Sequence, residues 1–250
     1  MTEPFRLFSL ALCSLLPLAC LDLGGEAEDE EEPPVDSDGD GLFDDEELEL
    51  GTDPDNSDTD GDGVDDLTEL DEGTNPIYEY SHSYLGGYNV GYCQDGMAEP
   101  TGATASNGHT ALYAEGDVVD NFTLIDQHGE EVDLYSFCGQ NVMLVFSAGW
   151  CGPCVQLSEE VQAIQDQYDN LQIFEILIED SAGNAPDQAD LEAWAEHGEM
   201  TNVAVLADGD YSVWPYWEAD WGIPSTSYIG PDGTVLSVDE YITNPSQVID

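Results

Sequence analysis

The sequence predicts an α/β fold in which a central mixed β-sheet is flanked by helices, preceded by an irregular repeat segment. Two apolar runs, residues 142–146 and 171–178, have strand length and flank an amphipathic stretch. In that stretch apolar residues recur at helical spacing, at Leu157, Val161, Ile164 and Tyr168. A strand–helix–strand crossover is nearly always right-handed and parallel. Upstream, residues 36–76 form an internal duplication with a 22-residue period.

The composition alone excludes some classes of binding partner. The 250 residues are 41% hydrophobic, which is enough for one ordinary domain plus an appendage. They include 56 Asp and Glu against a single basic residue, Arg6. Nucleic acid and anionic membrane surfaces are therefore poor partners. Self-repulsion of this size requires cations, either bound specifically or supplied by a salty medium.

Residues 1–19 have the pattern of an export signal. Arg6 is followed by an apolar core at residues 7–18, which is too short to remain as a membrane-spanning helix. The LPLAC sequence at residues 16–20 resembles a bacterial lipoprotein box, although Pro17 departs from it. The resemblance implies lipidation of Cys20 and a membrane-anchored lipoprotein that faces the periplasm or the cell surface of a bacterium. A simple secretory signal is the alternative.

Cysteine parity favours the lipoprotein. If Cys13 is removed and Cys20 is lipidated, an even number of cysteines remains, whereas ordinary cleavage would leave an odd thiol in an oxidising compartment. Residues 20–35, which are acidic and contain Pro33 and Pro34, are expected to be a solvated linker without a core of its own.

Each copy of the duplication at residues 36–76 has the ligand spacing of a seven-coordinate calcium loop, with oxygen ligands at positions 1, 3, 5, 9 and 12. Gly41 and Gly63 occupy position 6, where such a loop turns sharply, and Leu42 and Val64 would offer backbone carbonyls at position 7. The side-chain ligands are Asp36, Asp38, Asp40, Asp44 and Glu47, then Asp58, Asp60, Asp62, Asp66 and Glu69. About two Ca²⁺ ions are predicted.

Two other interpretations of the repeat compete with a calcium site. An acidic linker that merely repeats would not supply a full ligand set twice. A dockerin, which would imply a cohesin partner, needs an amphipathic helix where this chain has ELGTDP at residues 49–54. The segment instead resembles thrombospondin type 3 repeats, in which the chain wraps around calcium with little helix.

Residues 77–115 are rich in Tyr and Gly, lack a helical period and are interpreted as a lead-in that packs on the following domain. Cys93 and Cys138 are the two cysteines outside the N-terminal segment and the pair at 151 and 154. We expect them to form a structural disulfide. The alternative, a relay of disulfides to Cys151, is disfavoured because Cys138 precedes the far end of a strand.

The last domain is predicted at residues 116–250. A hairpin is expected from residues 122–125 and 132–134, a helix at 187–197 and a buried strand at 203–206. Residues 211–221 read as an aromatic helix or loop. Strands at 225–229 and 234–238 around a Gly-Pro-Asp-Gly turn form the closing hairpin, and only a short tail follows from Asn244.

The WCGPC motif at residues 150–154 follows the first apolar run and begins the amphipathic helix. A helix N-terminus carries partial positive charge and free N–H groups, which favour the thiolate of Cys151. Cys154, one turn further, can reach back to it. A C-x-x-C beside a β-α-β pattern indicates redox chemistry. A structural disulfide and half of a zinc site are the alternatives; a c-type haem is excluded because Val155, not His, follows Cys154.

This motif resembles the thioredoxin superfamily, and the flanking residues 120–124, Gly129 and 145–150 are closest to its exported TlpA/ResA-like (redoxin) branch. The likeness runs from about Gly116 to the C-terminus. It implies a thioredoxin fold, Cys151 as nucleophile, Cys154 as resolving thiol, and a cis-proline at Pro224 facing them. Because only a short tail follows from Asn244, we expect the last helix of that family to be shortened or absent here.

Several helpers seen in that superfamily are missing. Aligned on the motif, thioredoxins carry a buried Asp where this chain has Val145, and TlpA/ResA-like proteins carry a Glu where it has Leu157. No Lys is present in the domain. The proton acceptor for Cys154 stays open, with Glu175, Glu179 and Asp180 as candidates.

Three functions follow as hypotheses. The first is a lipid-anchored thiol-disulfide oxidoreductase that reduces protein disulfides, is re-reduced by a membrane electron donor and uses no organic cofactor. The second is a calcium-dependent surface or adhesion protein with an incidental redox domain. The third is a redoxin-type thiol peroxidase, which the missing Arg disfavours.

Overall fold

The computed structural model describes residues 33–93, 96–106, 108, 110–217 and 222–249. The chain divides into Met1–Pro33 and Pro34–Asp250, and every helix and strand of the described residues belongs to the second unit. The predicted export signal, Cys20 and residues 20–32 of the linker lie outside the described residues. Among the helices that are described, none is long and apolar enough to cross a membrane.

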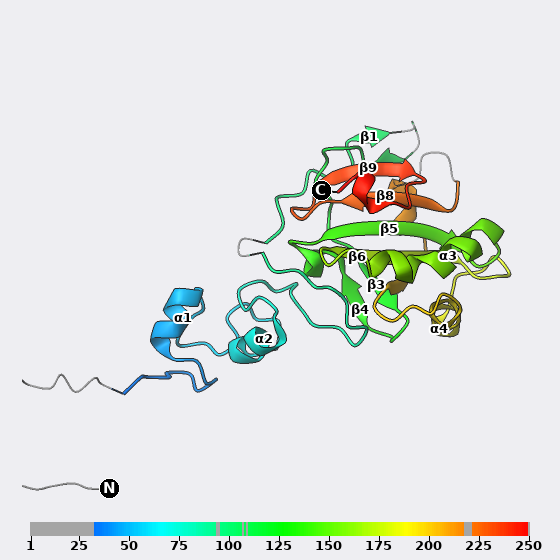
Figure 1. The fold of residues 1–250 in the computed structure, drawn as a ribbon. Coiled ribbons are helices and arrows are strands. Elements are labelled where there is room, and N and C mark those ends of the chain that lie inside the picture. The colour runs from blue at the N-terminus through cyan, green and yellow to red at the C-terminus, as the bar shows by residue number, and fades with distance from the viewer. Residues whose placement is uncertain (1–32, 94–95, 107, 109, 218–221, 250) are drawn as a thin grey trace, which may run out of the picture. The chain divides into compact units, whose positions relative to one another are not determined.

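A seven-stranded mixed sheet forms the centre of the unit, in the order β4-β3-β7-β6-β5-β8-β9 (Figure 1). The expected α/β class with a central mixed sheet is confirmed. The strands are β3 (Thr123–Asp126), β4 (Glu131–Asp133), β5 (Asn141–Ala148), β6 (Leu171–Glu179), β7 (Ala204–Ala207), β8 (Ser225–Ile229) and β9 (Val235–Glu240).

The middle of the sheet is parallel. β5 pairs with β6 and β6 with β7, and their residues are almost all buried, as expected for strands covered on both faces. Helix α3 (Gly152–Gln165) connects β5 to β6, and α4 (Gln188–His197) connects β6 to β7. Because both crossovers advance across the sheet in the same direction and are right-handed, α3 and α4 cover the same face. They contact each other there.

The outer strands are antiparallel hairpins, as predicted from their turn residues. β3 pairs with both β4 and β7, and β8 pairs with both β5 and β9. Between β7 and β8 the predicted aromatic segment contains the 3-10 helix η2 (Trp214–Tyr216). Asp208 fixes this turn by accepting hydrogen bonds from the Val213 and Trp214 backbone N–H groups. After β9, the described residues contain only the short 3-10 helix η3 (Pro245–Gln247).

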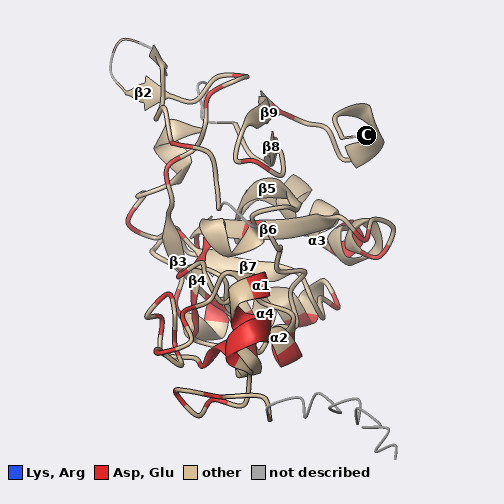
Figure 2. Ribbon diagram, turned by 90° about the vertical axis from the view of Figure 1, so that its left-hand side faces the viewer, with Lys and Arg blue, Asp and Glu red and all other residues tan. Residues whose placement is uncertain are grey.

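Each copy of the repeat contains a short helix, α1 (Asp44–Leu50) and α2 (Asp66–Glu72). This is more helix than the expected irregular wrap, although α1 ends at Leu50 and residues 51–54 of the ELGTDP stretch are not helical. Each helix begins at loop position 9, and its first turn is acidic, which suits the helix dipole. Each ends after seven residues at a left-handed glycine, Gly51 or Gly73. Figure 2 shows the Asp and Glu residues of both helices and no basic residue in the described chain.

The lead-in packs on the sheet through aromatic side chains. Tyr84 stacks on Phe137, at 6.0 Å between ring centroids, and Phe137 contacts Phe174 of β6 edge-on. Phe137 belongs to the 3-10 helix η1 (Leu134–Phe137), which precedes β5. Most of the lead-in is irregular, apart from the two-residue strands β1 (Ala105–Ser106) and β2 (Ala111–Leu112).

A disulfide between Cys93 and Cys138 joins the lead-in to the start of β5, with 5.7 Å between the Cα atoms. Nearby, the Gly91 N–H donates to the Ser136 carbonyl, and a Cβ atom at Gly91 would lie 1.7 Å from the Cys138 carbonyl oxygen. Only glycine permits so close an approach of the two backbones.

Candidate active site and cation-binding loops

The two cysteines of the WCGPC motif lie where β5 ends and α3 begins. They form a disulfide with 5.2 Å between Cα atoms. Cys151 is the N-cap of α3, and its Sγ accepts a hydrogen bond from the Cys154 backbone N–H at 3.3 Å. Cys151 is 5% exposed and Cys154 is 0% exposed. An incoming disulfide can therefore reach only Cys151, whereas Cys154 can react only with its neighbour.

The segment before β8 faces the first cysteine. The Ile223–Pro224 peptide bond is cis, and the Ile223 carbonyl oxygen lies 3.6 Å from Cys151 Sγ. The cis bond that was predicted before Pro224 is therefore present, and it lies beside Cys151. Ser225 and Thr226, which follow, are buried and pair with Phe146 and Val145 of β5.

Glu179, at the end of β6, holds the exposed tryptophan of the motif. Trp150 is 54% exposed, and its indole N–H donates to Glu179 Oε2 at 2.5 Å. Tyr211 donates its hydroxyl to the other oxygen, Oε1, at 2.6 Å. The Glu179 carboxylate raises the pKa of Tyr211 to about 12, with burial adding to the effect. Neither aromatic contact was anticipated from the sequence, because residues 150, 179 and 211 are far apart in the chain.

The three candidate proton acceptors have different surroundings. Asp180 closes the loop that follows β6 by accepting hydrogen bonds from the Asn184 backbone and side chain, which lower its pKa. Glu179 is engaged with Trp150 and Tyr211. Glu175 is fully buried in the middle of β6, and burial raises its pKa to about 8. Val145 and Leu157, the two positions at which the resemblance led us to look for a carboxylate, are buried apolar residues.

The Cys93–Cys138 disulfide lies at the opposite end of β5 from the WCGPC motif. The strand has eight residues, which at roughly 3.3 Å per residue span about 26 Å. This separation supports the structural interpretation of Cys93–Cys138 over a relay to Cys151.

In each repeat the first three aspartates converge. The ligand atoms of Asp36, Asp38 and Asp40 lie within 4.8 Å of one another, and so do those of Asp58, Asp60 and Asp62. Gly41 and Gly63, at position 6, have φ of 112° and 103°, which an L side chain rarely adopts. The position-12 residues Glu47 and Glu69 are fully buried.

Several buried carboxylate oxygens in these loops have no hydrogen-bond partner among the residues that the structure describes. They are Asp38 Oδ2, Asp40 Oδ2, Glu47 Oε2, Asp60 Oδ2 and Glu69 Oε2. Buried charges of this kind are normally paired or bound to metal. Burial raises the pKa of Glu47 to about 7 and that of Glu69 to about 8, and neighbouring aspartates add to both shifts. The five oxygens come from positions 3, 5 and 12, so these loops fit a hard cation with oxygen ligands.

The position-9 residues make hydrogen bonds within their own loops. Asp44 accepts hydrogen bonds from the Ser37 N–H and hydroxyl, and Asp66 accepts the same pair from Thr59. Each carboxylate is therefore bound to the position-2 residue of its own loop. It would contact a bound ion through a water molecule. Leu42 and Val64 donate their N–H groups to Asp40 and Asp62, an arrangement that sets the loop turn at position 7.

His82 contacts the second repeat loop, and this contact was not predicted from the sequence. Its Nδ1 lies 3.1 Å from Oδ2 of Asp62, the position-5 residue of the second loop. Its Nε2 lies 3.9 Å from Asp133 Oδ2 of β4. His82 thus lies between the second loop and the redox domain, and no spacing in the sequence indicates this.

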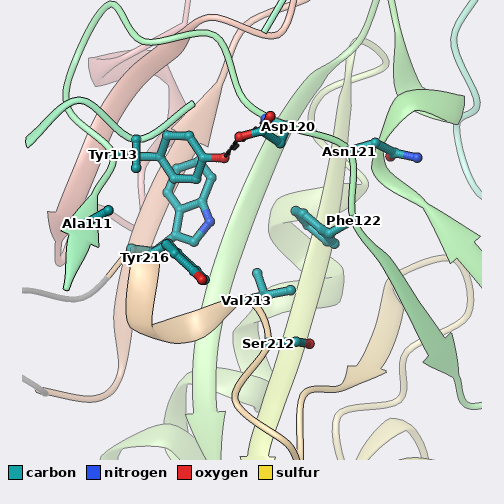
Figure 3. Close-up of a pocket in the computed structure, with 10 residues that line it drawn as sticks. Ala111, Tyr113, Asp120, Asn121, Phe122, Ser212, Val213 and Tyr216 are labelled. Carbon is teal, nitrogen blue, oxygen red and sulfur yellow. Dashed lines mark hydrogen bonds between the residues drawn. The ribbon is translucent and has the colours of Figure 1, made fainter. Parts of the chain in front are cut away.

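A cavity of about 340 Å³ has neither Cys151 nor Cys154 among its lining residues (Figure 3). Tyr113 and Trp217 pack there at 4.6 Å between ring centroids, and the Tyr113 hydroxyl donates to Asp120. Phe122 and Tyr216 complete its aromatic lining. None of the predicted site residues lines it.

The part of the chain that contains the cysteine pair is similar to a known protein family. Residues 116–238 match the AhpC/TSA family. A comparison with curated proteins found no match. Together with the C-x-x-C disulfide at a helix start, the family match identifies residues 116–238 as a thioredoxin-like oxidoreductase domain.

Solved structures that resemble the chain include three disulfide-exchange proteins. A secreted Mycobacterium tuberculosis disulfide oxidoreductase homologous to E. coli DsbE is 20% identical, with 49% of this chain and 85% of that chain covered and a TM-score of 0.40. The thioredoxin domain of a Bacteroides vulgatus thiol-disulfide oxidoreductase is 20% identical, covering 52% and 89%, with a TM-score of 0.42. The exposed lipoprotein thioredoxin of Streptococcus pneumoniae is 19% identical, covering 51% and 93%, with a TM-score of 0.41.

Proposed function

We propose that this protein is an exported, lipid-anchored disulfide reductase that acts through Cys151 and Cys154 and carries a calcium-binding spacer. The observation that carries the proposal is the cysteine pair at the start of α3, with Cys151 slightly exposed beside the Ile223 carbonyl and Cys154 buried. The AhpC/TSA match of residues 116–238 supports the redox class. The signal and lipoprotein patterns at residues 1–20 support export and anchoring.

The reaction begins with the reduced protein. The Cys151 thiolate attacks a substrate disulfide, forms a mixed disulfide and releases one substrate thiolate. Cys154 then attacks Cys151 Sγ, so that the Cys151–Cys154 bond forms and the second substrate thiolate leaves. The backbone around Ile223, beside Cys151, would align an extended substrate segment. A membrane electron donor returns the disulfide to two thiols.

The spacer would hold about two calcium ions. Asp36, Asp38, Asp40 and Glu47 with the Leu42 carbonyl would hold one, and Asp58, Asp60, Asp62 and Glu69 with the Val64 carbonyl would hold the other. Bound calcium would neutralise buried carboxylates that otherwise lack partners. The spacer then separates the lipid at Cys20 from the redox domain.

The test is an insulin-reduction assay on the purified chain. Cys151→Ser is expected to abolish disulfide reduction, since only Cys151 is exposed to substrate. Cys154→Ser is expected to accumulate a mixed disulfide, detected by non-reducing electrophoresis and mass spectrometry. Turnover that persists in Cys151→Ser would refute the assignment. Peroxide consumption by the same sample, with no insulin reduction, would favour a peroxidase instead.

A further inference from the structure

Glu175 is a buried carboxyl group that the proposed reaction has not yet used. It lies at the centre of β6 and is 0% exposed. Its Oε1 accepts a hydrogen bond from the Trp194 indole at 3.3 Å, while Oε2 has no partner within the described part of the chain. The domain has no Lys or Arg that could neutralise a charge there. Burying a carboxyl group without a charged partner lowers the stability of the fold, which indicates a functional role for Glu175.

Strand register brings Glu175 to the helix-covered face beneath the active site. Glu175 pairs with Val145 of β5, so the two side chains project to the same face. That face is the one covered by α3 and α4, because Trp194 of α4 contacts Glu175. Ser147, two residues along β5, projects to the same face and lies nearer to the cysteines. The carboxyl group is thus on the strand next to Val145, where thioredoxins carry their Asp.

Among the described residues, no charged group contributes to the pKa shift of Glu175. Its register neighbours are Val145 on β5 and Val205 on β7, both buried. The polar groups that influence its pKa are the Ser147 hydroxyl and the Trp194 indole, and both only partly offset the effect of burial. α3 covers this face, and Cys154 near its start is 0% exposed, whereas the acids of α3, Glu159 and Glu160, are exposed. Cys154 is therefore the titratable group of α3 that shares the buried interior with Glu175.

We propose that Glu175 is the proton acceptor for Cys154, with Ser147 positioned between them to orient or relay the proton. This inference rests on the proposed function. As Cys154 attacks the mixed disulfide, its S–H proton passes to Glu175, directly or through Ser147. The Cys154–Cys151 bond forms, the bond from Cys151 to the substrate sulfur breaks, and the substrate thiolate leaves and takes its proton from water.

A cavity of about 280 Å³ gives the proton a way out. Gly149, Val155, Leu177 and Trp194 are among its lining residues, so it borders the motif, α3, β6 and α4. Trp194 contacts both this cavity and the Glu175 carboxyl group. After each turnover Glu175 can return its proton to solvent at this side of the molecule. A pKa near 8 is close to the ordinary pKa of a thiol, about 8.5, which suits proton exchange between the two groups.

The decisive experiment separates the two chemical steps with 5,5′-dithiobis(2-nitrobenzoate). Reduced protein releases one thionitrobenzoate when Cys151 attacks and a second when Cys154 resolves the mixed disulfide. In Glu175→Gln, which keeps the shape of the side chain, the first release is expected within about twofold of wild type. The second is expected to slow by at least about tenfold at pH 7. Ser147→Ala should slow only the second release, by a smaller factor.

The pH profile distinguishes proton transfer from a structural role. The wild-type rate of the second release should level off above the pH at which Glu175 ionises. In Glu175→Gln it should keep rising about tenfold per pH unit until the thiol itself ionises. Glu192→Gln, an exposed change on α4, is the matched control. Val145→Asp combined with Glu175→Gln returns a carboxylate to the paired position and should restore the rate.

A Glu175→Gln protein with the wild-type rate and pH profile for the second release would overturn this inference alone. Absence of any second release from wild-type protein would instead overturn the proposed function. Thermal unfolding of each variant checks that it is folded. If Glu175→Gln does not fold, the Ser147→Ala rate and pH profile provide the same test, and a wild-type profile there would count against the relay.

Discussion

Glu175, Trp150 and His82 show how single residues gain their roles from partners far away in the chain. Glu175 accepts a hydrogen bond from Trp194, 19 positions further along the chain, and Trp150 donates one to Glu179, 29 positions further along. His82 contacts Asp62 and Asp133. Their functions follow from these contacts rather than from local sequence.

Glu175 should make the stability of the protein depend on pH. Its pKa is about 8 in the folded chain and close to 4.5 when unfolded. The folded state therefore holds a proton that the unfolded state releases between these values, which stabilises the fold below about pH 5. This contribution is lost as pH rises toward 8. With saturating calcium, the free energy of unfolding should fall on the order of 1 kcal/mol per pH unit in this window.

The measurement is denaturant unfolding of wild type and Glu175→Gln at pH 5, 6, 7 and 8. The variant should lack the part of the slope that Glu175 supplies, so the difference between the two proteins should change steadily across the window. Parallel slopes would show that Glu175 ionises in the folded protein as it does in the unfolded chain. Glu192→Gln should follow wild type.

Tyr211→Phe should loosen the exposed tryptophan of the motif. The tyrosine hydroxyl occupies one oxygen of Glu179, and Trp150 occupies the other. Without the hydroxyl, Glu179 and Trp150 should become more mobile. The measurement is the fluorescence anisotropy decay of a single-tryptophan variant that retains Trp150. A faster local motion is expected, and an unchanged decay would mean that Trp150 is held by other contacts.

At the scale of elements, the loops of the repeat show what a pattern can and cannot indicate. Ligand spacing predicted the converging aspartates and the turn glycines, because a calcium loop is a local structure. It did not predict that Asp44 and Asp66 bind their own Ser37 and Thr59, nor that α1 and α2 start inside the loops. These features depend on how each loop closes in three dimensions.

The redox domain shows the same division. The strand–helix–strand unit around the cysteines and the two hairpins follow from periodicity and turn residues. The place of β7 between β3 and β6 does not, since strand order depends on long-range pairing. Glu175 could be marked as a candidate because it lies on the strand after the motif. Its choice over Glu179 and Asp180 needed the register with Val145.

Calcium binding should order the repeat, and one position-12 residue should account for each ion. Isothermal calorimetry on the full chain is expected to give about two sites. Glu69→Gln should remove or greatly weaken one of them, and Glu47→Gln the other, because each deletes a buried carboxylate with an unpartnered oxygen. Exposed Glu49→Gln is the matched control. No heat and no change in circular dichroism at millimolar calcium would leave the segment an acidic linker.

At the scale of the whole molecule, charge sets the redox poise. The domain contains no Lys or Arg and many acids, which disfavour a thiolate at Cys151, although salt screens charges beyond roughly 8–10 Å. The motif has Gly152-Pro153 between its cysteines. We expect a reducing potential closer to the roughly −270 mV of thioredoxin than to the roughly −120 mV of a strong oxidant. Equilibration with glutathione buffers measures it, and a value above about −180 mV would indicate an isomerase or oxidase.

The Cys93–Cys138 bridge closes a stretch of chain with a sequence separation of 45. Replacing both cysteines with serine should lower the free energy of unfolding by roughly 2–5 kcal/mol. Chemical denaturation with and without calcium measures this. A loss below about 1 kcal/mol would mean that the aromatic contacts of Tyr84 and Phe137 alone hold the lead-in.

The two disulfides at opposite ends of β5 have different consequences for how this protein matures. A reductase whose own fold contains a disulfide has to be oxidised at one end before it can serve as a reductant from the other. The length of β5 keeps the thiols of Cys151 and Cys154 from reducing the Cys93–Cys138 disulfide of the same chain. Under the proposed function, maturation would require an oxidising step that closes Cys93–Cys138, while an electron donor would keep Cys151 and Cys154 reduced. One eight-residue strand would thus separate a disulfide that stays closed from a cysteine pair that opens and closes in each reaction cycle.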